Sequence, residues 1–263
     1  MNSKLVKVLV TGLLAIVLLG CADVKPKTIN DFSDYYARGI ESFKKKRWDK
    51  AIEDFNLVLL NSPGGELADD AQYYLGECYF EKKEYLLAIS EYQQLTERYS
   101  YSPLVEDASY KMVLSYVELS PKYQRDQVYT DRALLALQEF LDSFPDSKYR
   151  SEIEAKIRDM RNKLARKMYE SGVLYTKLLQ WDAAIIYFDN MLEDYYDTKY
   201  APLAKLDKAL CLIRMRKFDE YKVFMAELEE NLDLKKYSDK LANLKRAMAR
   251  EKKRIAREQK RNR

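Results

Sequence analysis

The chain has 263 residues, with 46 Lys and Arg against 42 Asp and Glu, and it contains no histidine. Without histidine it can build neither a Ser-His-Asp triad, nor a Cys-His pair, nor a histidine-ligated metal site. Apolar residues make up 47% of the chain, which is enough for a core. Seven glycines and six prolines are too few for a glycine-rich nucleotide-binding fold or a many-turned β-sandwich. The composition therefore favours a helical protein that works by binding.

Residues 1–20 have the pattern of a secretory signal. A positively charged start precedes an apolar run at 8–19, which is too short to cross a bilayer because a spanning helix takes about 20 residues. The run ends in Leu19 and Gly20 before Cys21, an order that resembles the lipobox of bacterial lipoproteins. In such proteins the cysteine carries the lipid, so we expect Cys21 to bear palmitate-type acyl chains and to anchor the chain to a membrane.

The residues after the signal indicate where the anchored chain is delivered. By resemblance to lipoprotein sorting, an Asp directly after the cysteine retains a protein at the inner membrane, whereas here that position is Ala22. We therefore expect the outer membrane, with the protein facing the periplasm, and a short lipidated tether at 21–30. The other two cysteines, Cys78 and Cys211, lie in apolar segments and are expected to be core residues.

The body of the chain repeats one pattern with a period of about 37 residues. The pattern is a glycine followed at fixed spacings by an aromatic residue, an alanine and a second aromatic residue. Its three clear copies are Gly39, Trp48, Ala51 and Phe55; Gly76, Tyr85, Ala88 and Tyr92; and Gly172, Trp181, Ala184 and Phe188. Weaker copies begin at Val113 and Ala209. Such a period is typical of stacked helix pairs.

The residue types in the pattern suggest how the helices of a pair pack. A small residue lets two helices approach, so we expect each glycine to face the alanine of its own copy, as Gly39 would face Ala51. The copy that begins at Val113, which is the third along the chain, is longer than the others. We expect it to have an extended inner turn near Ser120 and a long following helix, which is marked by an apolar face at 153–168.

The pattern resembles the tetratricopeptide repeat, which implies an all-α superhelix of about five helix pairs with a basic helical tail. The lipobox, the five repeats, the longer middle turn and the basic end together resemble the BamD family, outer-membrane lipoproteins of the machine that inserts β-barrel proteins. On this reading the chain divides into a signal at 1–20, the tether at 21–30, repeats one to three at 31–150, a long helix with repeats four and five at 151–234, and the tail at 235–263.

The resemblance implies a function and a set of partners. It implies a non-catalytic adaptor that binds unfolded outer-membrane proteins and hands them to the barrel-forming subunit. It implies contact with this BamA-like subunit through the C-terminal repeats, and it leaves room for other assembly lipoproteins. No cofactor is expected apart from the covalent lipid on Cys21, and no nucleic acid, because the chain carries an export signal.

A row of aromatic residues is the candidate client site. Members that belong to the same repeat, such as Tyr36 and Phe43, lie two helical turns apart, so they share a helix face. The row consists of Tyr36, Phe43, Tyr73, Phe80 and Tyr110. In tetratricopeptide repeats this face tends to line the groove, where tyrosine suits peptide capture because it combines apolar area with a hydrogen-bonding tip. Aromatic rows at this spacing also pack between repeats, and both readings stay open here.

The end of the chain is strongly basic. Residues 235–263 hold thirteen Lys and Arg against three acidic residues, while residues 21–234 carry more acidic than basic side chains. A thin apolar line at Leu241, Leu244, Met248 and Ile255 indicates that this segment extends the last helix. It would then suit anionic lipid headgroups or an acidic partner. A solvated, frayed helix fits the charge equally well.

Two other classes of function compete with the adaptor. Another envelope repeat lipoprotein, in pilus assembly or cell-wall coordination, would share the anchor and the repeats. An enzyme would need convergent catalytic groups, and the acidic pairs at 69–70 and 106–107 do not supply them, because neighbouring residues on a helix point apart. We therefore predict no catalytic residues and no metal site.

Overall fold

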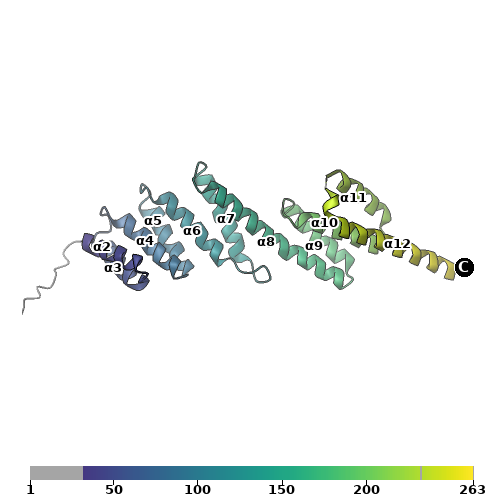
Figure 1. Ribbon diagram of the computed structural model, residues 1–263, viewed down its shortest axis with the longest axis horizontal. Coiled ribbons are helices and arrows are strands. Elements are labelled where there is room, and N and C mark those ends of the chain that lie inside the picture. Colours follow the sequence, from purple (N-terminus) through teal and green to yellow (C-terminus); the bar gives the residue numbers. More distant parts are fainter. Residues whose placement is uncertain (1–31, 232, 263) are drawn as a thin grey trace, which may run out of the picture. The chain divides into compact units, whose positions relative to one another are not determined.

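The computed structural model describes residues 32–231 and 233–262, and every regular element within these ranges is a helix (Figure 1). The all-α prediction is confirmed. The predicted signal, the lipidation site Cys21 and the tether lie outside the described residues. Among the described helices, none has the length and apolar character that crossing a membrane requires.

The chain divides into two compact units, with the boundary between Cys78 and Tyr79, inside one helix. The first unit contains α2 (Phe32–Lys44), α3 (Trp48–Asn61) and most of α4 (Ala68–Glu81). α2 and α3 pack as an antiparallel pair. Their core is made by Ala51, Phe55 and Val58, all fully buried.

The second unit runs from Tyr79 to the end of the chain, and its successive helices pack against one another. Its helices are α5 (Tyr85–Arg98), α6 (Val105–Leu119), α7 (Val128–Ser143), α8 (Arg150–Lys177), α9 (Trp181–Asp194), α10 (Ala201–Arg214), α11 (Phe218–Asn231), the short 3-10 helix η1 (Leu234–Tyr237) and α12 (Ser238–Arg261). α8 has 28 residues, about twice the length of its neighbours. It runs from the third repeat into the fourth.

Four helix pairs turn in the same way. Lys46, Lys83, Leu179 and Arg216 have positive φ angles near 60°, each just before the second helix of its pair. At Arg216, the amide of Lys217 donates to the carbonyl of Leu212 and the amide of Arg216 donates to that of Ile213, which is the Schellman arrangement. The third pair differs, because Ser120 is extended and residues 120–127 form a longer loop. The predicted longer inner turn therefore lies between α6 and α7.

The repeat glycines make room for aromatic rings. The atoms nearest to a Cβ built on Gly39 all belong to the ring of Phe55, at 2.6 to 3.0 Å, and those nearest to Gly172 belong to the ring of Phe188. The nearest neighbour of the glycine at these two positions is therefore an aromatic ring, which the spacing along the chain did not predict. The second aromatic residue of the pattern fills the space that the missing side chain leaves.

The basic end of the chain is a separate helix that packs against the last repeat. α12 begins after η1 and lies alongside α10 (Figure 1). Leu244 and Ala247 are buried among residues of α10 and α11, and Leu241 and Met248 pack against the same cluster. The predicted apolar line is thus the buried face of α12. The chain turns before this helix, so α12 does not continue the last repeat helix.

Candidate binding surfaces

Three of the predicted client-site residues lie in the first unit and pack around Tyr74. The ring centroid of Phe43 is 5.3 Å from that of Tyr74, and those of Tyr36 and Tyr73 lie 6.4 Å and 5.9 Å from it. Burial and the nearby Asp70 carboxylate raise the pKa of Tyr36. All three predicted residues remain partly exposed. Tyr74 was not predicted from the sequence, because the repeated spacing falls on Tyr73 and Tyr74 is the residue after it.

The other two predicted residues lie in the second unit and differ in exposure. Phe80 packs edge-on against Tyr85 and stays partly exposed, with the Lys111 ammonium 5.0 Å from its ring centroid. Tyr110 stacks face to face on Tyr149, with ring centroids 3.7 Å apart, and is only 8% exposed. Tyr110 is therefore mainly a core residue, whereas Phe80 keeps a surface that a ligand could touch.

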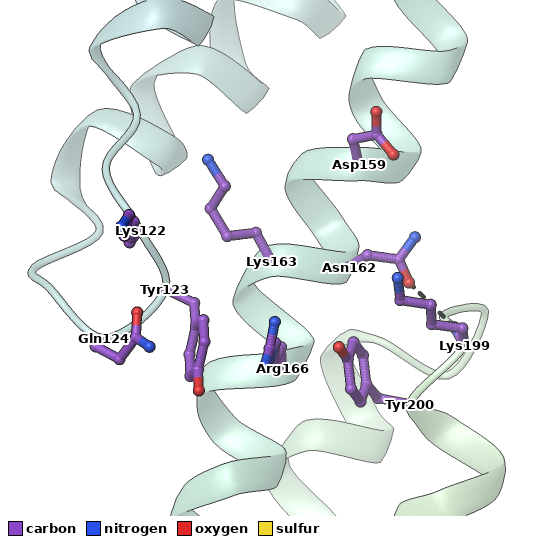
Figure 2. A pocket seen from close by; sticks show the side chains of 9 residues that line it. All are labelled: Lys122, Tyr123, Gln124, Asp159, Asn162, Lys163, Arg166, Lys199 and Tyr200. Carbon is purple, nitrogen blue, oxygen red and sulfur yellow. Dashed lines mark hydrogen bonds between the residues drawn. The ribbon is translucent and has the colours of Figure 1, made fainter.

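A hollow of about 450 Å³ lies over α8 in the second unit (Figure 2). Lys163 and Arg166 of α8 form its floor. Lys122 and Tyr123 of the 120–127 loop stand on one side of the helix, and Lys199 and Tyr200 of the α9–α10 turn stand on the other. Its charged lining is four basic side chains and one acidic side chain, Asp159. We call this site the basic hollow.

The 120–127 loop owes its shape to its own polar side chains. The amide nitrogen of Gln127 donates to the carbonyls of Lys122 and Arg125 at 3.0 and 2.9 Å. Two lysines of α8 also form hydrogen bonds with the loop. Lys163 donates to the Ser120 hydroxyl at 2.7 Å, and Lys167 donates to the carbonyl of Arg125 at 2.7 Å. The extra residues of the third repeat thus become one wall of the basic hollow.

The cations of the basic hollow are held by contacts that do not neutralise them. The Arg166 guanidinium lies 4.0 Å from the ring centroid of Tyr123, and its only ion pair among the described residues is a long one, 3.9 Å, to Glu170. The backbone amide of Lys199 donates to the Asn162 side chain at 3.1 Å, which fixes the second wall. Burial lowers the pKa of Lys163.

Among the described residues, four ion pairs join α12 to α10 and its turn. Lys240 reaches both oxygens of Asp207 at 2.5 Å, and the Tyr169 hydroxyl of α8 donates to the same carboxylate at 2.7 Å. Arg214 pairs with Glu251 at 3.2 Å, and Arg216 pairs with Glu258 at 2.8 Å and with Glu251 at 3.8 Å. Glu251 and Glu258, two of the three acidic residues of this basic segment, thus face the repeat.

Both internal cysteines are core residues, as predicted: Cys78 and Cys211 are fully buried. Burial, with a contribution from Asp207, raises the pKa of the Cys211 thiol to about 12, which keeps it protonated and unreactive at neutral pH. Within the described ranges, no group of three or more Cys, Asp or Glu side chains is arranged to hold a metal ion.

Paired antiparallel helices that share a glycine–aromatic pattern define a tetratricopeptide-type repeat protein, a class of binding scaffold. The chain belongs to the YfiO family of outer membrane lipoproteins, whose profile matches residues 29–220. The family resemblance stated from the sequence is confirmed.

Two similar proteins are outer membrane protein assembly factors. The chain is 26% identical over 197 residues to the outer membrane protein assembly factor BamD of Caulobacter vibrioides, covering 73% of this chain and 65% of that protein. It is 26% identical over 231 residues to BamD of Rickettsia prowazekii, covering 87% of this chain and 92% of that protein. Among solved structures, a repeat protein of Bacteroides fragilis aligns with a TM-score of 0.44 at 16% identity, covering 82% of this chain and 85% of that one.

Proposed function

We propose that the chain is a non-catalytic adaptor in the assembly of β-barrel proteins at the outer membrane. The observation that carries the proposal is the family match over residues 29–220, together with relatives named as outer membrane protein assembly factors. A stack of helix pairs suits this role because it offers extended surfaces to several partners. Lipid on Cys21 would hold the adaptor at the membrane where its clients are inserted.

Within this role, the partly exposed aromatic residues would receive the client. The candidate residues are Tyr36, Phe43 and Tyr73 in the first unit and Phe80 in the second. Their ring edges offer apolar area, and the tyrosines add hydroxyl groups that can bond to a peptide backbone. Tyr110 would support this surface from the core, because Tyr149 covers its ring.

The barrel-forming subunit would dock on the α10–α11 pair. Val223 of α11 is 72% exposed and lies beside Leu212 and Phe224 in a shallow apolar depression. The depression is rimmed by Asp219 and Glu227. An apolar centre with a charged rim is the usual anatomy of a protein–protein interface.

Client binding is tested with a labelled peptide that ends in an aromatic residue. Replacing Tyr73 and Phe80 together by Ala should weaken its binding about tenfold, because each aromatic contact contributes on the order of 1 kcal/mol. The matched control is Tyr101→Ala, since the side chain of Tyr101 is fully exposed and lies outside the proposed surface. Equal affinity in the double variant and the control would exclude these residues as the client site.

The adaptor role itself is tested by purifying the tagged chain from solubilised envelopes and identifying the proteins that accompany it. We expect a large β-barrel protein with periplasmic domains. Val223→Asp should remove that partner while α-helical content stays unchanged, because the substitution places a charge in the centre of the proposed interface. Recovery of pilus or cell-wall proteins instead would move the chain to a different envelope function.

A further inference from the structure

We propose that the basic hollow over α8 binds an extended acidic peptide segment, one that carries several Asp or Glu side chains, from a partner protein. The proposal rests on the geometry of the hollow and does not depend on the assembly role.

Most of the positive charge of the basic hollow is not neutralised by ion pairs. Within the described residues, Lys122, Lys163 and Lys199 form no ion pair with a carboxylate, and Arg166 forms only the long one to Glu170. Other lysines of the second unit are closely paired: Lys208 with Asp189 at 2.6 Å and Lys240 with Asp207 at 2.5 Å. The basic hollow is lined by four cations and one carboxylate, whereas in residues 21–234 as a whole the acidic side chains outnumber the basic ones. A concentrated positive site on an acidic body attracts anions.

The four cations of the basic hollow are spread out along it. They come from three separate segments, with Lys122 and Lys199 on opposite sides of α8 and the other two between them (Figure 2). A compact phosphate would be met by backbone amides or an arginine fork at one point. Carboxylates spaced along a chain that crosses α8 would instead meet one cation after another.

The walls of the basic hollow suit a polypeptide. Tyr123 and Tyr200 flank the cations from the two sides, and together with Gln124 and Asn162 they line the hollow with ring faces and amide groups. Aromatic faces pack against peptide planes and aliphatic stems, and tyrosine hydroxyls and side-chain amides bond to backbone groups. A volume of about 450 Å³ accommodates a few residues of an extended chain.

The ammonium group of Lys163 is held by the Ser120 hydroxyl and carbonyl, at 2.7 and 3.4 Å. Burial lowers its pKa, although the nearby Asp159 and Glu118 carboxylates oppose this shift. These two carboxylates form no ion pair with Lys163, so part of the cost of burying its charge is not offset in the free protein. An incoming carboxylate would form a direct ion pair, and this part of the cost would be recovered on binding.

The test uses the full-length chain in nonionic detergent and a fluorescent, end-capped peptide of alternating glutamate and serine. Binding is followed by fluorescence anisotropy at physiological ionic strength. We expect saturable binding that is lost when glutamine replaces glutamate in the peptide. Lys122→Ala with Lys199→Ala should weaken binding about tenfold, the effect of two partly exposed charge pairs. Among the described residues, neither lysine side chain forms a hydrogen bond or an ion pair, and Lys199 makes only a cation–π contact, 5.6 Å from the ring centroid of Tyr200, so the thermal midpoint should change little.

The matched control is Lys252→Ala with Lys253→Ala on the exposed face of α12, which removes the same charge from the most basic segment of the chain. It should leave peptide affinity within about twofold of the parent protein, because surface charges beyond a Debye length of about 8 Å are screened. An equal loss in both double variants would mean nonspecific attraction and overturn the proposal.

Two further probes distinguish other anions. Inorganic phosphate and phosphatidylglycerol vesicles are each tested for binding alone and as competitors of the peptide. If either binds through Lys122 and Lys199 while the glutamate peptide does not bind, the hollow is a phosphate or headgroup site and the proposal is wrong. A charge-reversed variant, Lys122→Glu with Lys199→Glu, should reject the glutamate peptide and accept a lysine–serine peptide.

Discussion

Arg216 of the α10–α11 turn forms a two-point ion pair with Glu258 of α12, and both nitrogen–oxygen distances are 2.8 Å. The same arginine has a φ of 61°, in the left-handed region that favours glycine. A residue under backbone strain thus provides the outermost of the charged contacts that hold the basic helix.

Replacing Arg216 by Gly should loosen the end of α12 without weakening the repeat. The turn loses its strain, while the ion pair, which is largely exposed, contributes at most about 1 kcal/mol. Hydrogen exchange should therefore accelerate for amides after Glu251, and global stability should change by less than about 1 kcal/mol. Lys83→Gly, at the equivalent turn of the α4–α5 pair, is the control and should leave exchange in α12 unchanged. Unchanged exchange after Arg216→Gly would show that the pair does not hold the helix.

The Lys240–Asp207 contact should be the main charged anchor of α12. Asp207 keeps only 16% of its side chain exposed, so removing Lys240 leaves a largely buried carboxylate with Tyr169 as its remaining partner. Lys240→Met should lower the unfolding free energy by about 1 to 3 kcal/mol. A double-mutant cycle with Asp207→Asn, measured by denaturant unfolding, should give a coupling above about 0.5 kcal/mol. Additive effects would contradict this assignment.

The glycines of the first and fourth repeats, Gly39 and Gly172, should be required by the rings opposite them. A methyl group on Gly39 would lie 2.6 Å from the Cε1 atom of Phe55, so Gly39→Ala should destabilise by about 1 to 3 kcal/mol. Adding Phe55→Leu should recover part of this loss, because the smaller side chain vacates the overlap. Gly64→Ala is the matched control, since no atom lies within 4 Å of its built Cβ, and it should be close to neutral. Thermal unfolding of the three variants shows whether the loss comes from contact with the ring or from alanine replacing glycine at any position.

The buried charge of Lys163, which we propose serves binding, should lower the free energy of unfolding. Burial lowers the pKa of Lys163 in the folded state. At a pH below this lowered pKa the side chain is charged in both states, and the charge is less well solvated in the folded state than in the unfolded chain. The unfolded state therefore binds more protons between the lowered pKa and the ordinary value of about 10.5, and stability rises with pH across this window. Lys163→Met should raise the unfolding midpoint at pH 7, and its advantage should shrink as the pH increases through the window. A lower midpoint at pH 7 would show that the bond to Ser120 outweighs the burial cost.

Much of the fold could be predicted because its determinants are local. The glycine–aromatic period indicates the helix pairs, and the apolar face at 153–168 indicates the long α8, since both depend on spacing along one helix. The partner of each glycine could not be predicted in the same way, because the ring of Phe55 reaches Gly39 by packing across the pair.

The surfaces were less predictable than the helices. Tyr110 and Tyr73 occupy equivalent positions in their repeats. The ring of Tyr110 is nevertheless buried, because Tyr149, which is distant in the sequence, stacks on it. The basic hollow has no signal in the sequence, because Lys122 and Lys199 are brought together only by the way the loop and the α9–α10 turn meet α8. Interactions between distant segments decide burial and charge clustering, and a periodic pattern does not encode them.

The central claim is that this chain serves the assembly of outer-membrane β-barrels. The most direct measurement depletes the chain in its own bacterium and follows newly made barrel proteins by their heat-modifiable migration on gels. The adaptor account predicts that unfolded barrel proteins accumulate before other envelope functions fail, and that the chain restores folding while a Cys21→Ala variant, which lacks the proposed lipidation site, does not. Normal barrel folding after complete depletion would contradict it.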